Sequence, residues 1–221
     1  MKVINLSEQN TILNKFLAEM RDPEYQKNRL LFRNNVNRVG EIEAYEISKS
    51  FTYEQQDVQT PLGVAKVQMP QDEVVIGTIF RAGLPFHNGF LEIFDHADNT
   101  FVSAYREYTN EEHTEVGIHI EYLATSDVAG KTLILADPML ATGGSMEWAW
   151  KAIMTKASGM PKHIHVACLM AAPEGIEHIK KIFPEEITTI WCACIDKGLD
   201  AQKYIVPGFG DCGDLCYGGK I

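Results

Sequence analysis

Residues 133–145 read Leu-Ile-Leu-Ala-Asp-Pro-Met-Leu-Ala-Thr-Gly-Gly-Ser, and this stretch decides the fold. An apolar strand runs into an acid and a turn of small residues. A helix follows directly, with apolar residues from Met146 to Ala157 along one face. The turn therefore lies at the carboxyl end of a strand and at the N-terminus of a helix. Unpaired backbone N–H groups and the positive end of the helix dipole favour a phosphate there.

The small and hydroxylated residues of the turn suit a phosphate. Gly143 and Gly144 let the backbone approach an anion closely, while Thr142 and Ser145 add hydroxyl donors. A bare Thr-Gly-Gly-Ser would by itself favour an ordinary strand-to-helix turn capped by Ser145. The complete order of strand, acid, turn and helix favours the phosphate loop, although it matches neither G-x-x-x-x-G-K-[ST] nor G-x-G-x-x-G.

Further apolar runs on both sides of this stretch predict the rest of the sheet. They cover residues 74–80, 101–105, 163–170 and 187–193, and helical segments at 84–94, 144–157 and 173–182 lie between them. Runs that are apolar on both faces and alternate with helices are typical of parallel strands with helical crossovers. We therefore predict an α/β fold, with a mainly parallel sheet flanked by helices, in one domain over residues 1–221.

Three other segments carry weaker predictions. Apolar residues at helical spacing between positions 10 and 36 predict two N-terminal helices. Pro61-Leu62-Gly63 predicts the turn of a short strand or hairpin within residues 59–69. Residues 107–130 are polar, show little periodicity and lie between two strand candidates, so they could form a flexible arm or flap.

The composition fits a cytosolic globular protein. Of 221 residues, 45% are hydrophobic and 23% are charged, which is close to the average of globular domains. The start lacks the apolar run of a signal peptide, and no stretch is long enough to span a membrane. Five cysteines without a C-x-x-C pair favour free thiols over a disulfide framework or a zinc site. We therefore expect a soluble protein of the cytoplasm.

The net charge narrows the range of partners. A value of −10 argues against nonspecific binding to nucleic acid or to an anionic membrane. A polyphosphate substrate would then depend on a few placed arginines, a divalent cation and backbone N–H groups.

Three stretches, in the same order along the chain, resemble the uracil phosphoribosyltransferases, a type I phosphoribosyltransferase family. Residues 137–145 are similar to its signature for 5-phosphoribosyl 1-pyrophosphate (PRPP), with a proline after the acid. Residues 204–214, Tyr-Ile-Val-Pro-Gly-Phe-Gly-Asp-Cys-Gly-Asp, are similar to its uracil-binding segment, and Phe80-Arg-Ala-Gly-Leu84 is a third match. The resemblance implies the type I fold, with N-terminal helices and a C-terminal hood over the base. It implies a glycosyltransferase of pyrimidine salvage that transfers the phosphoribosyl group of PRPP to uracil, giving UMP and pyrophosphate.

The resemblance also implies the residues of the site. It assigns Asp137, Asp211 and Arg106 to catalysis, with Asp137 at the ribose hydroxyls and Arg106 at the pyrophosphate. Mg²⁺ is the implied cofactor, held mainly through PRPP, with no metal ligands assigned to the protein. The residues implied for PRPP are Arg81, Arg106, Asp137, Pro138, Met139, Leu140, Ala141, Thr142, Gly143, Gly144, Ser145 and Asp211. Those implied for uracil are Ile205, Gly210, Asp211 and Cys212.

Other interpretations stay open for several of these residues. Arg81 and Arg106 could be surface ion-pair partners, and Asp211 could be a turn residue. Cys212 stands where the family usually has alanine, Leu215-Cys216 follow Asp214 where a basic or larger residue is common, and residues 107–126 do not match the family's flap.

The alternative function is that of a regulatory or nucleotide-binding protein of the same fold, or a relative with weak or altered base specificity. RNA binding would need a basic face, which a charge of −10 does not indicate. The resemblance further implies a homo-oligomer, either a dimer or a tetramer, and allows GTP as an effector.

Overall fold

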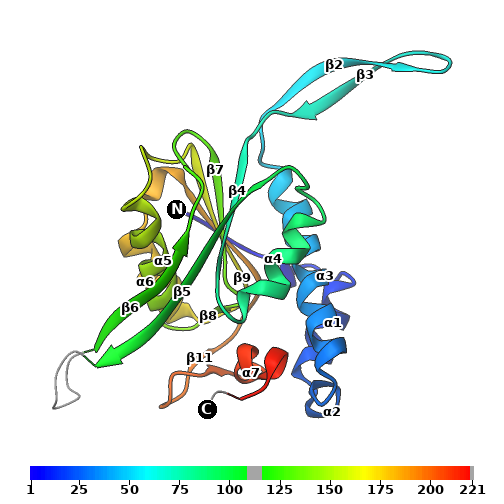
Figure 1. Ribbon diagram of the computed structural model, residues 1–221. Helices are drawn as coiled ribbons and strands as arrows, with labels where there is room; N and C mark the ends of the chain where they lie inside the picture. Colours follow the sequence, from blue (N-terminus) through cyan, green and yellow to red (C-terminus); the bar gives the residue numbers. More distant parts are fainter. Residues whose placement is uncertain (109–115, 220–221) are drawn as a thin grey trace.

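An eight-stranded, mostly parallel sheet forms the centre of the computed structural model (Figure 1). The structure describes residues 1–108 and 116–219, with the main chain alone over 104–108 and 116–121. The order of strands is β1 (Lys2–Asn5), β10 (Thr188–Ile195), β9 (His163–Ala171), β7 (Thr132–Ala136), β4 (Val74–Ile79), β5 (Asp98–Tyr108) and β6 (Val116–Ala124). The short β8 (Met139–Leu140) also pairs with β9. Within this sheet β6 is antiparallel to its neighbour β5.

Helices cover both faces of the sheet, so the predicted α/β class is confirmed. One face carries α1 (Leu13–Arg21), α3 (Arg29–Ser48) and α4 (Gly83–Leu91), and the other carries α5 (Gly144–Met154) and α6 (Pro173–Ile182) (Figure 1). In β7, Ile134 packs into the first of these cores, whereas Leu133 and Leu135 pack into the second. Two covered faces explain why the central strands read as continuous apolar runs.

The N-terminal helices are divided by two capping residues. Asp22 caps the short α2 (Pro23–Gln26) by accepting the N–H of Glu24 at 2.8 Å, and Asn28 caps α3. The two predicted helices therefore appear as α1 and α3, with α2 between them. A Cβ on Gly89 of α4 would lie 2.1 Å from a carbonyl oxygen of α3, so glycine permits this helix contact.

Some segments differ from the sequence-based expectation. The predicted hairpin is longer, with β2 (Tyr53–Thr60) and β3 (Gly63–Pro70) projecting from the body as an arm (Figure 1). The span 107–130, expected to form a flexible arm or flap, contains β6, which pairs with β5 at the edge of the sheet. Residues 109–115 of this span lie outside the described residues. The sequence Val-Gly-Ile-His-Ile-Glu-Tyr of β6 alternates apolar and polar residues, and the acids around it concealed this strand pattern. β1 was not predicted because four residues at an edge carry little periodicity.

The topology opens a crevice between β4 and β7, which are paired and parallel. After β4 the chain crosses through α4 to β5 on one side, and after β7 it crosses through α5 to β9 on the other. Ligands of such sheets bind at the carboxyl ends of strands where the connections diverge. Arg81 and Asp137, which follow these two strands, lie at that edge. Over the described ranges, none of the helices has the length and apolar character needed to cross a bilayer.

Candidate active site

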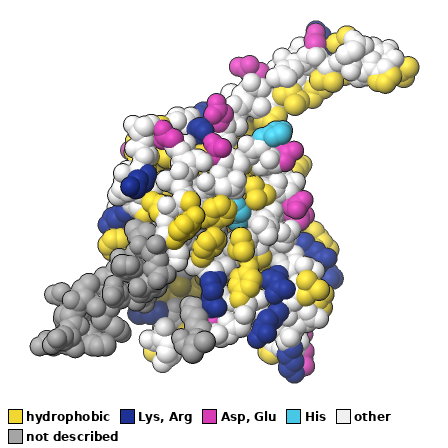
Figure 2. Space-filling model, viewed as in Figure 1, with side chains coloured by type: hydrophobic (Ala, Val, Ile, Leu, Met, Phe, Trp, Pro, Cys, Tyr) yellow, Lys and Arg dark blue, Asp and Glu magenta, His cyan; other side chains and the backbone are white. Residues whose placement is uncertain are grey.

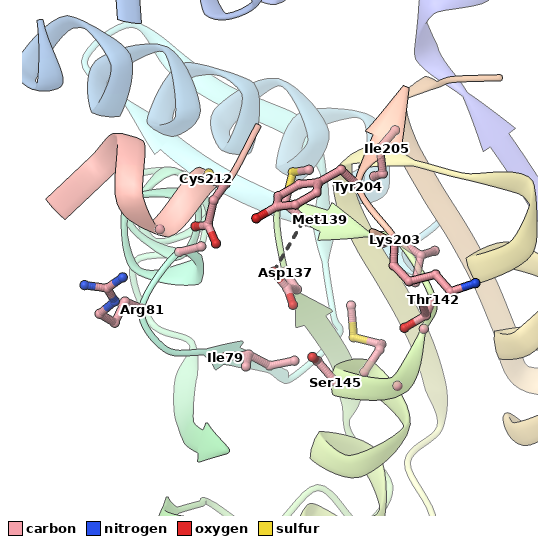
Figure 3. Close-up of a pocket in the computed structure, with 18 of the residues that line it drawn as sticks. Ile79, Arg81, Asp137, Met139, Thr142, Ser145, Lys203, Tyr204, Ile205 and Cys212 are labelled. Atoms are coloured by element: carbon pink, nitrogen blue, oxygen red, sulfur yellow. Dashed lines mark hydrogen bonds between the residues drawn. The ribbon is translucent and has the colours of Figure 1, made fainter. Parts of the chain in front are cut away.

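A cavity of about 300 Å³ lies at the carboxyl ends of β4 and β7 (Figure 3). Three parts of the chain line it: residues after β4, the loop that connects β7 to α5, and the C-terminal segment 203–213. This segment contains β12 (Ile205–Val206), which pairs antiparallel with the preceding β11 (Gly198–Leu199), and it leads into α7 (Cys212–Tyr217). The segment closes the cavity opposite the phosphate loop.

The two glycines of the phosphate loop have different reasons to be glycine. Gly143 has φ +84°, and a Cβ there would lie 2.9 Å from the His178 ring on α6, so the fold itself requires glycine. A Cβ on Gly144 would meet only Thr142 Oγ1, at 3.7 Å, beside the cavity that Gly144 lines. The first glycine shapes the loop, and the second leaves space at its surface.

The N-terminus of α5 faces the cavity with its main chain. The helix begins after Gly143 and has no side-chain cap, so Ser145 is not the capping residue. The first N–H groups of a helix have no partner within the helix. Gly144, Ser145 and Met146, which carry such groups, all line the cavity together with Thr142. The loop can therefore offer several N–H donors and hydroxyls to one anion.

Asp137 stands at the base of the cavity, immediately after β7, with 9% of its surface exposed. Burial raises the pKa of Asp137 to about 7. The N–H of Met139, 3.3 Å from Oδ1, opposes this rise, and the nearby charge of Asp211 adds to it (Figure 3). The carboxyl group can therefore gain or lose a proton near neutral pH.

Asp211 lines the same cavity from the C-terminal segment and caps α7. Its Oδ1 accepts the N–H of Asp214 at 2.9 Å. The interpretation of Asp211 as a turn residue is thus half right, because it is a helix cap whose carboxylate also borders the cavity. The Gly-rich sequence of this segment concealed the short helix, which is stabilised by its cap and by burial of Cys212 and Cys216.

The arginines and Pro138 are placed differently from one another. Arg81 lines the cavity and also forms the predicted kind of ion pair, with 2.8 Å between Nη2 and Asp214 Oδ1. The main chain of Arg106 lies in β5 opposite Ile118, and its side chain is outside the described residues. Pro138 lies behind the cavity wall, where its carbonyl oxygen accepts the N–H of Met170 at 2.9 Å.

The segment that resembles a uracil site borders the same cavity as the phosphate loop. Ile205, Gly210 and Cys212 all line the cavity. Ile205 and Cys212 are buried, and both belong to the hydrophobic core. Met139, Leu140 and Ala141, which the resemblance implies for PRPP, also line this cavity.

Lys203 lines the cavity although the sequence analysis did not select it. Its φ of 68° makes it the non-glycine residue with positive φ in the described part of the chain. Asp200 forms the turn that produces this conformation, since its Oδ1 accepts the N–H groups of Gln202 and Tyr204. The Lys203 side chain runs past Thr142 at the edge of the phosphate loop (Figure 3). The sequence feature that could have indicated this turn is Asp200, an aspartate at the start of a short connection between two strands.

Comparisons with known proteins agree with this arrangement. A family model described as uracil phosphoribosyltransferase matches residues 7–219. The chain is 53% identical over 221 residues to a uracil phosphoribosyltransferase of Porphyromonas gingivalis, covering 100% of both proteins. It is 36% identical over 217 residues to one of Pyrococcus furiosus, covering 97% of this chain and 89% of the relative. The solved AQ2163 protein from Aquifex aeolicus is 30% identical, with a TM-score of 0.82 over 98% of both chains.

Proposed function

The chain belongs to the uracil phosphoribosyltransferase family, and from this premise we propose how its residues divide the reaction. The enzyme transfers the phosphoribosyl group of PRPP to uracil and produces UMP and pyrophosphate. One observation carries the proposed roles: the phosphate loop at α5 and the segment 205–212 border the same cavity. The alternative of a regulatory protein is not favoured, because relatives named for the enzyme match this chain along its full length.

The loop is proposed to bind the 5-phosphate of PRPP. Main-chain N–H groups at the start of α5 would donate to the phosphate oxygens, with the Thr142 and Ser145 hydroxyls beside them. Asp137 would accept hydrogen bonds from the two ribose hydroxyls. Such donors favour the charged form of a carboxylate, so binding would lower the raised pKa of Asp137.

Mg²⁺ suits the oxygen donors of the cavity. Asp137 and Asp211 are hard ligands on two sides of it. Within the described residues no group of three or more His, Cys, Asp or Glu side chains could hold a metal ion, so PRPP itself would supply most of the ligands. Mg²⁺, when bound, would neutralise charge on the departing pyrophosphate.

The protein would accelerate the reaction mainly by positioning the two substrates and by stabilising the charge that develops on them. Uracil N1 would bond to the anomeric carbon as the bond from that carbon to the pyrophosphate oxygen breaks, and the N1 proton would pass to water or to the departing pyrophosphate. Positive charge develops on the ribose ring during this exchange. The Asp137 carboxylate would stabilise that charge, and Arg81 and Arg106 would contact the pyrophosphate. To make this contact, Arg81 would lose part of its ion pair with Asp214.

Base selection is proposed to rest on main-chain groups of Ile205, Gly210 and Cys212. Uracil presents N3–H as a donor and O4 as an acceptor, whereas cytosine presents an acceptor and an amino donor at these positions. A carbonyl and an amide placed for uracil would both face like partners in cytosine. At about 1 to 3 kcal/mol for each unpaired buried group, the two mismatches amount to roughly 2 to 6 kcal/mol.

Pyrophosphate release tests the proposed function directly. The protein is incubated with PRPP, Mg²⁺ and each pyrimidine and purine base in turn. Uracil should support release, and cytosine should support it far more weakly. Equal release with several bases, or release without Mg²⁺, would contradict the proposed site.

The arm is proposed to contact a second copy of the chain in a dimer or tetramer. Exposed apolar side chains lie along the arm (Figure 2), and they are those of Val58, Leu62, Val64, Val67 and Met69. A two-stranded hairpin alone is at best marginally stable in water. A partner that covers its apolar residues would supply the missing stabilisation.

We also propose activation by GTP, which the resemblance allows, and a cytoplasmic location and a single domain over residues 1–221, which the composition and the sequence pattern indicate. Adding GTP to the same assay at subsaturating PRPP measures the first. Fractionation of the native cell addresses the second, and limited proteolysis addresses the third.

A further inference from the structure

A partly buried ion pair lies behind the segment proposed to read uracil. Arg21 is the last residue of α1, and Asp196 follows β10. Two hydrogen bonds join them, from Nη2 to Oδ1 at 2.7 Å and from Nη1 to Oδ2 at 2.9 Å. Only 6% of the Asp196 side chain and 26% of the Arg21 side chain are exposed. This bidentate geometry requires the planar guanidinium group of arginine.

Both members of the pair also hold the main chain of Gly208. Asp196 Oδ2 accepts the Gly208 N–H at 2.9 Å, and Arg21 Nη1 donates to its carbonyl oxygen at 3.0 Å. Gly208 has φ +51°, and a Cβ there would lie 2.1 Å from the carbonyl oxygen of Ile205. The main chain of Gly208 therefore lies close to the Ile205 carbonyl, within the same turn.

A second contact from the same N-terminal region supports the segment. Gln26 Nε2 donates to the carbonyl oxygen of Phe209 at 3.0 Å, and the Phe209 ring packs edge-on against Phe32, with 5.5 Å between centroids. The N-terminal helices thus hold residues 208 and 209 from outside the cavity. Neither Arg21 nor Asp196 lines the cavity itself.

We propose that Arg21 and Asp196 are positioning residues for base recognition, which set the main chain of residues 205–212 without touching either substrate. The proposal rests on the proposed function of that segment. A displacement of reacting or recognising groups by about 1 Å can lower a rate by about 100-fold. Loss of the pair should therefore act on uracil and leave the phosphate loop, on the other side of the cavity, unchanged.

The charges of the pair persist at neutral pH. Burial opposes ionisation of Asp196, but hydrogen bonds from Arg21 and from the Gly208 N–H outweigh it and hold the pKa of Asp196 below its ordinary value. The hydrogen bond with Asp196 likewise raises the pKa of Arg21. Arg21→Lys keeps the positive charge but loses the two parallel N–H donors of the guanidinium. It therefore separates the effect of geometry from that of charge.

Steady-state kinetics on Arg21→Lys, Arg21→Met and Asp196→Asn test the proposal. For Arg21→Met and Asp196→Asn we expect kcat/KM for uracil to fall by about 10-fold to 100-fold, through KM for uracil, and the preference for uracil over cytosine to narrow. KM for PRPP should stay within about twofold, because the phosphate loop is remote from the pair and Asp211 is held separately by its hydrogen bond from the Asp214 N–H. Arg21→Lys should recover part of the loss. Lys15→Met is the matched control, because Lys15 lies on the same helix and forms an exposed ion pair with Glu19.

The outcomes separate this proposal from its premise. Equal losses for uracil and PRPP would show a general structural role and overturn it, and so would unchanged base preference in all three variants. If Arg21→Met does not fold, Arg21→Lys and Asp196→Asn decide the matter. A wild-type enzyme that does not distinguish uracil from cytosine would instead refute the proposed role of segment 205–212.

Discussion

Asp137 shows how a single residue can serve the substrate at a cost to the empty protein. Burial raises its pKa from an ordinary 3.8 to about 7. Because the folded state then binds the proton more tightly than the unfolded chain, the contribution of Asp137 to the free energy of unfolding is largest below about pH 4. It is lost as the pH rises through about 7, by a total of about 4 kcal/mol.

Asp137→Asn should therefore stabilise the substrate-free protein at pH 8 and inactivate the enzyme. Asparagine keeps the shape but carries no charge, so the gain over wild type should approach the few kcal/mol estimated above at pH 8 and fall to about 1 kcal/mol at pH 4.5. Urea unfolding of both proteins at the two pH values measures it. Parallel pH dependences for the two proteins would contradict the raised pKa.

Lys203 carries backbone strain next to the phosphate loop. Its positive φ costs a residue with a Cβ about 1 kcal/mol relative to glycine. Lys203→Gly should raise the free energy of unfolding by about that amount, and should raise KM for PRPP because a positive charge beside the loop is lost. Lys181→Gly, at an exposed position of α6, is the control and should lower stability by about 1 kcal/mol. A destabilised Lys203→Gly protein would argue against the strain.

At the scale of elements, Gly143 and Gly144 at the start of α5 are glycine for different reasons. Gly144→Val should abolish measurable PRPP affinity with little change in stability, because the new side chain would stand beside the cavity. Gly143→Val should also lose stability, since its side chain would enter α6 near His178. Calorimetry with PRPP and thermal unfolding of both variants distinguish the cases. Unchanged PRPP affinity in Gly144→Val would remove this loop from the phosphate site.

At the scale of the whole molecule, the arm tests the proposed assembly. Successive residues of a strand point to opposite faces, and Val67 shares a face with Val58 and Met69 according to the register of the hairpin. Val67→Asp should shift the sedimentation coefficient from an oligomer towards a monomer, because a charge would be buried in the contact. Gln68→Asp places the same charge on the opposite face and should leave the assembly unchanged. An identical response of both variants would contradict a contact through the apolar face.

The sequence alone determined those features that short, contiguous segments encode. Residues 133–145 carry the strand, the acid, the glycine turn and the helix in one piece, so the phosphate loop and the parallel sheet could be predicted from spacing and residue type. The segment 204–214 was identified only through its resemblance to the uracil-binding segment of the family, because its turn-forming residues alone indicate no more than a turn. Local patterns failed for β1, β6 and α7, where partners across a sheet edge, a helix cap and burial stabilise short or weakly patterned segments.

Only the tertiary structure decided how distant segments share the site. It distinguished Gly143 from Gly144, because the neighbour that excludes a side chain at Gly143 comes from another helix. It raised the pKa of Asp137, because burial is a property of the whole fold. It also joined Arg21 to Asp196, 175 residues away along the chain. Nothing in either local sequence specifies that pair, since a contact between remote residues depends on the packing of every element between them.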